Sequence, residues 1–287
     1  MKLGYFPGCS LHSTAKPYDM STQEIFKALG MELNEIPDWN CCGATPAHSE
    51  DHLLALALPA RNLALAEKAG IKEIIAPCAA CYSHLKKSAV EAQDKKLHQK
   101  LQKIIEMEYK NSSNVRNILE VLVTLVGLDK IKARVKKPLK GLKVASYYGC
   151  LLTRPHKVTQ FDHPTNPQTM DDVMRALGAD VVEWGAKADC CGASYAVSKT
   201  EVVYNLSGHI LESAKEAGAD VIATACPMCQ SNLDTRQSNI EKIFEREFDL
   251  PILYVTELIG LSFGIPALRL GLGKRLVSAN KVLANIS

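Results

Sequence analysis

Five cysteines occur twice in the same order, and they are the residues best suited to metal chemistry in this chain. The first array consists of Cys9, Cys41, Cys42, Cys78 and Cys81. The second array consists of Cys150, Cys190, Cys191, Cys226 and Cys229. Together they include every cysteine of the 287 residues. Thiolates are ligands for zinc and for iron–sulfur clusters, so each array predicts a metal centre.

Three simpler explanations account for the arrays less well. Neighbouring cysteines such as Cys41 and Cys42 cannot bridge each other without severe strain, which argues against disulfides. A structural zinc ion takes four ligands and leaves one thiol over in each array. A cubane 4Fe-4S cluster also takes four, often from closely spaced C-x2-C runs. What remains is an iron–sulfur centre with five thiolates, or with four and one in reserve, and counting does not choose between them.

Composition and charge narrow the class of protein. Apolar residues make up 47% of the chain and charged residues 23%, as in ordinary globular proteins. The net charge of +3 is too small to indicate nucleic-acid binding. The N-terminal MKLGYFPGCS has no apolar signal segment, so we expect a cytoplasmic protein with free thiols.

The most apolar run, residues 258–273, does not predict a transmembrane segment. Pro266 and Arg269 interrupt it, and it is shorter than the ~20 apolar residues that a membrane-spanning helix needs. An interfacial or partner-docking role for this tail stays open.

The same series of elements carries each array. KLGYFPG and KVASYYG read as short strands that end at the first cysteine of each array. A helix is expected next, and Ser21 with Glu24 in one unit, and Thr169 with Asp172 in the other, predict capping boxes at its start. Later, IKEIIAP and ADVIATA read as buried strands that lead directly into C-x-x-C.

A second helix is expected between the CCG turn and the buried strand. In the second unit its apolar face comprises Val203, Leu206, Ile210 and Ala214. In the first unit Pro59 predicts a kink or break within residues 51–69.

Strands that alternate with helices predict an α/β fold with two tandem, pseudo-repeated domains, each built on a short, mainly parallel sheet. We place the boundary near Pro138, which gives a first unit of residues 1–137 and a second unit of residues 138–287. Ligand-binding loops of such sheets lie at the carboxyl ends of the strands. The three cysteine groups of a unit are therefore expected to converge at that edge.

The two units correspond closely in their spacing. A separation of 148 positions relates Gly30 to Gly178, Gly70 to Gly218, Cys78 to Cys226 and Cys81 to Cys229. These glycines are predicted to end helices. Cys9 and Cys150 are only 141 positions apart, so the loop LLTRPHKVTQFDHPTNP after Cys150 holds seven extra residues. We call this segment, residues 151–167, the asymmetric loop.

Residues 86–114 form a second asymmetry, because this segment is longer than its counterpart and rich in lysine and glutamate. Its apolar positions predict one helical face: Leu97, Leu101, Ile104 and Ile105. We interpret it as a surface helix that covers the core, with docking of a partner subunit as the alternative.

Both halves contain the same pattern: a single cysteine, then CCG, then C-x-x-C. This pattern resembles the duplicated cysteine-rich CCG domain family, which includes the B subunit of heterodisulfide reductase from methanogenic archaea. The resemblance covers both units. It implies that the ten cysteines hold two noncubane 4Fe-4S clusters, one in each array. It also implies an oxidoreductase that reduces the coenzyme M–coenzyme B heterodisulfide to two thiols, with no catalytic side chain beyond the cluster ligands.

Partners follow from the same resemblance. It implies a ferredoxin-like C subunit and, through it, a flavin-bearing A subunit. The chain has no GxGxxG or P-loop motif with which to bind its own flavin or nucleotide.

The implied substrate carries a sulfonate on one arm and a phosphate and a carboxylate on the other, so cationic side chains are expected around it. The candidates are His12, Lys16, Arg154, His156 and Lys157. Each has a simpler interpretation as an exposed surface charge. We expect the asymmetric loop, which holds three of them, to distinguish the two arms.

Two other functions remain as alternatives. Related CCG domains occur in complexes of the succinate or fumarate and the glycolate or lactate oxidoreductase types, where this chain would serve as the membrane-linked electron-transfer component. A binding module with two structural zinc sites is the non-enzymatic alternative.

Overall fold

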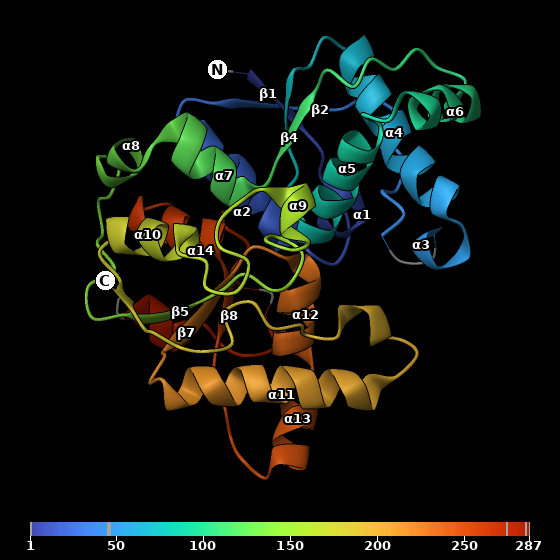
Figure 1. Ribbon diagram of the computed structural model, residues 1–287. Coiled ribbons are helices and arrows are strands. Elements are labelled where there is room, and N and C mark those ends of the chain that lie inside the picture. Colours follow the sequence, from blue (N-terminus) through green and yellow to red (C-terminus); the bar gives the residue numbers. More distant parts are fainter. Residues whose placement is uncertain (1, 45–46, 274, 285, 287) are drawn as a thin grey trace.

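Two four-stranded parallel sheets form the framework of the protein (Figure 1). The computed structural model describes residues 2–44, 47–273, 275–284 and 286. The first sheet has the order β2-β1-β3-β4, with β1 Lys2–Tyr5, β2 Glu32–Glu35, β3 Glu73–Ile75 and β4 Asn114–Arg116. The second has the order β6-β5-β7-β8, with β5 Lys143–Tyr147, β6 Asp180–Val181, β7 Val221–Thr224 and β8 Ile252–Tyr254. The predicted fold class, a tandem α/β pseudo-repeat, is confirmed.

Helices follow the strands in both units. In the first unit they are α1 Gly8–Leu11, α2 Lys16–Ala28, α3 Ala47–Glu50, α4 His52–Lys68, α5 Ala79–Glu91, α6 Lys95–Ile105, α7 Ile118–Val121, the π-helical turn η1 Leu122–Val126 and α8 Leu128–Lys132. In the second unit they are α9 His156–Thr159, α10 Thr169–Ala176, the 3-10 turn η2 Ala193–Tyr195, α11 Thr200–Glu216, α12 Pro227–Thr235, α13 Gln237–Phe244, α14 Val255–Ser262 and α15 Asn280–Ala284. All four residues of the central strand β7 are buried, as expected where helices cover both faces of a parallel sheet.

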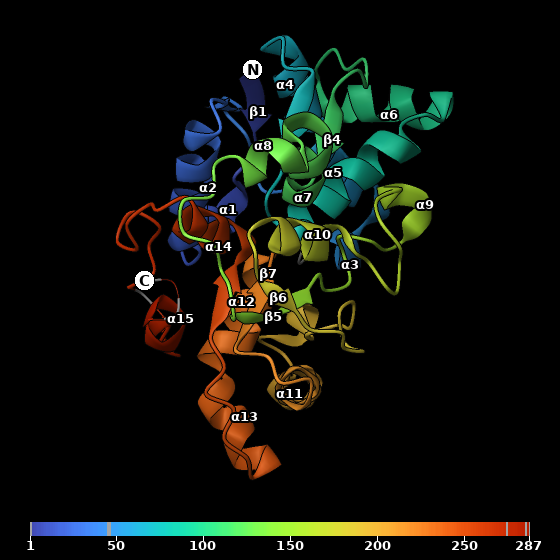
Figure 2. The same ribbon diagram turned by 90° about the vertical axis from the view of Figure 1, so that its left-hand side faces the viewer.

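Each unit ends with helices that pack against the other unit. Helix α14 packs on α2, while α7, η1 and α8 pack against α10 (Figure 2). The rings of Tyr18 and Tyr254 stack across this contact with centroids 4.1 Å apart, and the buried hydroxyls of Ser21 and Thr256 lie 2.6 Å apart. The closing helices therefore join the two units, and the boundary at residues 137 and 138 stays a proposal.

Neither predicted capping box forms. Helix α2 begins at Lys16, well before Ser21, whose hydroxyl donates to the carbonyl of Tyr18 and faces α14. Helix α10 begins at Thr169 itself. The backbone N–H of Thr169 donates a hydrogen bond of 2.7 Å to the carboxylate of Asp162 in the preceding loop. Tertiary contacts thus use these hydroxyls and N–H groups in place of the local motif.

The predicted helix ends are confirmed at Gly30 and Gly178, which follow α2 and α10 with φ of 73° and 85°. The break predicted at Pro59 is wrong, because α4 runs continuously past it. Proline removes one backbone hydrogen bond, but α4 is capped by Asp51, which accepts from Leu54 N at 2.7 Å, and packs along α5 and α6. This packing outweighs the local cost.

The amphipathic helices cover the core as expected. In α11, Val203, Ile210 and Ala214 are buried, whereas Leu206 is partly exposed. In α6, Leu101 is buried and Ile104 is half exposed, and the helix packs on α4. This packing supports the interpretation of α6 as a surface helix.

Candidate functional site

All the cysteines lie beyond the carboxyl ends of strands. In each unit the single cysteine follows the central strand β1 or β5, and the C-x-x-C follows its neighbour β3 or β7. The adjacent pair lies on the loop after the edge strand β2 or β6. Parallel strands bring these three loops to one edge of the sheet, which is why cysteines far apart in the sequence meet there.

The thiols of the first array lie close together. The sulfurs of Cys42 and Cys81 are 3.4 Å apart, and the backbone N–H of Gly43 donates to Cys41 Sγ at 3.4 Å. A hydrogen bond with Cys41, and then one with Cys81, lowers the pKa of Cys42 to about 3. The first array thus favours a thiolate at Cys42.

The second array repeats this arrangement. Cys191 and Cys229 have sulfurs 3.5 Å apart, those of Cys150 and Cys190 are 4.0 Å apart, and Gly192 N donates to Cys190 Sγ at 3.4 Å. All ten cysteines are free thiols.

The two arrays approach each other at Cys78 and Cys226, two buried thiols that affect each other's pKa across the boundary between the units. Hydrogen bonds with Cys229 and with Cys78 hold the pKa of Cys226 well below its usual value, and backbone N–H groups at the start of α12 add to this. Electron-carrying groups held by the two arrays would therefore be neighbours.

A cavity of about 130 Å³ opens beside the second array. The first unit contributes Ala44, Ala79 and Ala80 to its lining. The second unit contributes Tyr148, Cys150, Leu151, Cys190, Cys191, Ala193, Ser194, Cys226, Met228 and Cys229. The cavity thus lies between the units, and its walls are mostly apolar apart from the thiols.

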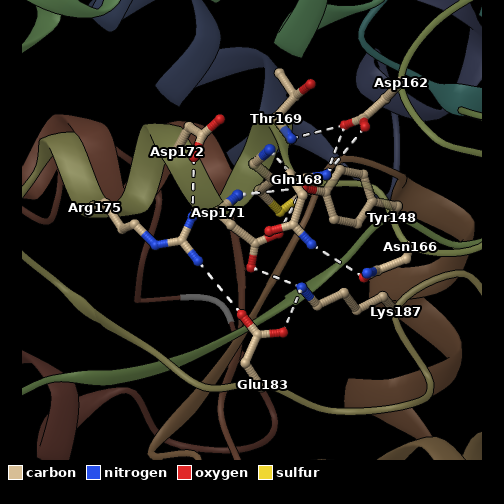
Figure 3. A network of polar contacts seen from close by, with 11 residues as sticks. Tyr148, Asp162, Asn166, Gln168, Thr169, Asp171, Asp172, Arg175, Glu183 and Lys187 are labelled. Atoms are coloured by element: carbon tan, nitrogen blue, oxygen red, sulfur yellow. Dashed lines mark hydrogen bonds and ion pairs between the residues drawn. The ribbon is translucent and has the colours of Figure 1, made fainter.

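A buried polar network holds Tyr148, one wall of this cavity (Figure 3). Its hydroxyl donates to Asp171 Oδ2 at 2.9 Å and accepts from Met170 N at 2.6 Å. Lys187, only 1% exposed, places Nζ 3.3 Å from Asp171 Oδ1 and 3.4 Å from Glu183 Oε2. The network fixes the Tyr148 ring against the first turn of α10.

The asymmetric loop is anchored at two points. Asp162 accepts hydrogen bonds from the backbone of Gln168 and Thr169 (Figure 3). On the other side, the hydroxyl of Tyr82 on α5 donates to the carbonyl of Thr159 at 3.1 Å, so the loop from the second unit rests on the first. Helix α9 of this loop packs on α5, whose N-cap residue is Cys78.

Replacing Asp162 by Ala is expected to lower the free energy of unfolding by about 1 kcal/mol, the usual effect of losing an N-terminal helix cap. Chemical denaturation measures this, with Asp162→Asn as the matched control, because asparagine keeps an acceptor oxygen and tolerates the φ of 53° found here. Equal stability of the Ala and Asn variants would contradict the capping role.

The two first-unit cations predicted to bind substrate lie on the surface. His12 places Nε2 3.4 Å from Glu35 Oε2 and packs edge-on against Trp39. Lys16 pairs with Asp19 at 3.1 Å. Neither residue contributes to the described lining of the cavity.

The three predicted cations of the second unit lie along the asymmetric loop. Arg154 donates to the carbonyl of Ala188, next to the CCG turn. The pKa of Cys190 falls to about 6, chiefly through a hydrogen bond with Cys150 and with a smaller contribution from Arg154. His156 and Lys157 are exposed on α9. The structure thus brings Arg154 near a cysteine, without adding any of the three to the cavity lining.

The donor set fits an iron–sulfur group. Among the described residues, no three His, Cys, Asp or Glu side chains converge on the position of a single metal ion. Five thiols around one sheet edge, with backbone N–H groups aimed at Cys41 and Cys190, suit a larger sulfur-rich and negatively charged group. In the same part of the chain, no helix is long and apolar enough to cross a membrane.

The fold and the paired cysteine arrays agree with the comparisons. The family model described as a cysteine-rich domain, CCG, matches residues 3–86 and 144–234. The chain therefore belongs to the CCG cysteine-rich domain family.

Named relatives span nearly the whole chain. It is 35% identical to the 8-methylmenaquinol:fumarate reductase membrane anchor subunit of Wolinella succinogenes, over 98% of this chain and 99% of that protein. It is 31% identical to the B subunit of the ferredoxin/F(420)H(2)-dependent CoB-CoM heterodisulfide reductase of Methanosarcina acetivorans, over 99% and 97%.

A solved structure shares the fold. The crystal structure of a hypothetical protein from Helicobacter pylori matches with a TM-score of 0.75 at 13% identity, over 96% of this chain and 52% of that one. Both named relatives are, by their names, subunits of reductases.

Sequence reasoning missed the aromatic and amide groups around the second array. Tyr147, Tyr148 and Asn232 all approach it, and Asn232 Nδ2 donates to the carbonyl of Cys191 at 3.0 Å. The one available signal was the difference between FPGC in the first unit and YYGC in the second.

Proposed function

We propose that this chain is the cluster-bearing subunit of an oxidoreductase, with one noncubane 4Fe-4S cluster held by each five-cysteine array. The closeness of the two arrays carries this proposal, because Cys226 lines the same cavity as Ala79, the residue after Cys78, so the two sites are neighbours within one chain. Such clusters supply one-electron transfers. Two adjoining sites suit a reaction that needs two electrons.

The reaction we propose is cleavage of the coenzyme M–coenzyme B heterodisulfide, for which the Methanosarcina acetivorans relative is named. Two electrons and two protons convert one disulfide into two thiols. The apolar cavity between the units suits the disulfide sulfurs, because Ala79, Ala80 and Met228 give its walls apolar surface. Arg154, next to the CCG turn, is positioned to bind an anionic end of the substrate.

The electrons would come from partner proteins. We propose a ferredoxin-like C subunit fed by a flavin-bearing A subunit, and a cytoplasmic location for the assembly. Among the described residues the cavity lining contains no charged nitrogen, so binding of the substrate's anionic groups depends on side chains at the cavity's edge or on the partners.

A second function is favoured by the 35% identity to the Wolinella succinogenes protein. In this alternative the chain transfers electrons between a quinol and a fumarate-reducing flavoprotein. The mostly apolar cavity suits this role too, since no anionic substrate then has to enter it.

Anaerobic purification with quantification of iron and acid-labile sulfide tests the shared part of both functions. The expected content is two 4Fe-4S clusters for each chain, whereas zinc without sulfide would refute both. EPR after addition of coenzyme M under oxidising conditions then separates them. A new thiol-dependent signal supports heterodisulfide reduction, while its absence from a fully loaded sample that a quinol analogue reduces supports the fumarate-linked function.

A further inference from the structure

A glycine precedes the first cysteine of each array, Gly8 in the first unit and Gly149 in the second. In the first unit, a Cβ atom on Gly8 would lie 2.6 Å from Cys81 Sγ and 3.6 Å from Cε1 of the Phe6 ring. Gly8 and Gly149 both have a φ of 66°. In this unit the C-x-x-C thiol and the hydrocarbon edge of an aromatic ring therefore lie around the same point.

In the second unit a hydroxyl takes the place of that edge. A Cβ atom on Gly149 would lie 3.0 Å from Cys229 Sγ and 3.7 Å from the hydroxyl oxygen of Tyr147. Tyr147 stands 141 positions after Phe6, the same offset that relates Cys150 to Cys9. A phenol thus replaces a phenyl ring against the equivalent cysteine.

The Tyr147 hydroxyl has one hydrogen and two possible acceptors. It donates to the carbonyl of Asp189 at 2.8 Å, and the Cys229 thiol is the other acceptor nearby, because Cys229 Sγ and the Tyr147 oxygen lie 3.0 Å and 3.7 Å from the same point, the position of a Cβ atom on Gly149. The side chain is fully buried, so water does not compete for this hydrogen. As negative charge on the Cys229 sulfur grows, the charge-assisted bond to sulfur becomes the stronger of the two.

The buried CCG cysteines have comparable polar neighbours in the two arrays. Asn232 Nδ2 lies 3.6 Å from Cys191 Sγ in the second array, and His84 acts on the pKa of Cys42 in the first. Each buried CCG cysteine thus has one polar side chain nearby. At the C-x-x-C cysteine the arrays differ in the hydroxyl of Tyr147.

We propose that the Tyr147 hydroxyl raises the reduction potential of the cluster held by the second array above the value it would have beside a phenylalanine. The potential of this cluster is then also higher than that of the cluster held by the first array. This inference rests on the proposed function, because it requires both clusters. Hydrogen bonds to cluster sulfurs stabilise the reduced, more negative state and so raise the potential. Electrons would then collect at the second array. All five of its cysteines line the cavity, and one of them, Cys226, is the neighbour of Cys78.

Replacing Tyr147 by Phe tests this directly, since it gives the second array the residue that the first already has. An EPR-monitored redox titration of the anaerobically purified protein should resolve two one-electron transitions. The variant should move only the higher one downward, by about tenfold in its equilibrium constant or ~59 mV. The reciprocal variant Phe6→Tyr should move the lower transition upward.

A control variant keeps the outcomes distinct. Tyr109→Phe removes another buried tyrosine hydroxyl, bonded to Asn111 far from the cysteines in sequence, and should leave both potentials unchanged. Loaded clusters whose potentials ignore Tyr147→Phe would overturn this inference alone, whereas wild-type protein without clusters would overturn the proposed function. If Tyr147→Phe fails to load, an unchanged lower transition in Phe6→Tyr overturns the inference equally.

Discussion

Replacing Cys191 by Ser is expected to abolish the proposed two-electron reaction while sparing the first array. Cys191 is buried, and its sulfur lies 3.5 Å from that of Cys229. A serine hydroxyl is a hard and weakly acidic ligand that does not replace a thiolate. Changes to supporting residues alone weaken metal sites by about 10–100-fold, so loss of a direct ligand should reduce turnover by more than ~100-fold.

Iron and sulfide analysis shows whether this loss is confined to one array. Cys191→Ser should retain about half of each element, in keeping with one remaining 4Fe-4S cluster. Cys42→Ser is the matched variant, because Cys42 holds the same position in the first array and also pairs with a C-x-x-C thiol. Full iron content together with full turnover in either variant would contradict the assignment of these ligands.

Replacing Arg275 by Met should produce the largest loss of stability among substitutions outside the arrays. Arg275 is 3% exposed, and its guanidinium contacts the fully buried Glu257 and donates to the carbonyl of Ile252 at 2.6 Å. It also lies over the ring of Tyr254, which stacks on Tyr18 between the units. Breaking a buried ion pair leaves an uncompensated charge, so we expect a loss of about 3–5 kcal/mol.

The pH dependence of this variant has a definite sign. Burial raises the pKa of Glu257, and the neighbouring Arg275 opposes that rise. Without Arg275 the pKa rises further, so the folded state binds the proton more tightly than the unfolded state does. The contribution of protonated Glu257 to the stability of the variant is then fully present below the unfolded-state pKa of roughly 4.3. It is lost as the pH rises through the pKa of Glu257 in the folded state. The deficit should be largest near pH 8 and shrink toward pH 5.

Denaturant unfolding across that pH range measures the effect. Arg269→Met is the matched control, because Arg269 lies on the same C-terminal tail but is 55% exposed and pairs with Glu24 at the surface. Surface pairs contribute about 0–1 kcal/mol, so the control should lose little stability and show no trend with pH. A pH-independent deficit in Arg275→Met would argue against an unpaired Glu257.

Local and repeated features were readable from the chain alone. The order of strand, cysteine, helix and CCG turn recurs in both units, and each step depends on residues close in sequence. Gly30 and Gly178 end their helices because a positive φ at those points is a local requirement. The parallel sheets follow from alternating strands and helices, and they bring the cysteine loops to one edge. These features therefore determined the fold class and the two arrays.

Long-range contacts decided the rest. Ser21 and Thr169 match a capping box, yet one contacts Thr256 and the other donates its backbone N–H to Asp162. Pro59 breaks no helix, because packing on α5 and α6 outweighs one missing hydrogen bond. The exchange of closing helices between the units, and with it the meeting of the two arrays, depends on surfaces far apart in sequence. Periodicity records which face of a helix is apolar, but only the tertiary structure determines which partner covers it.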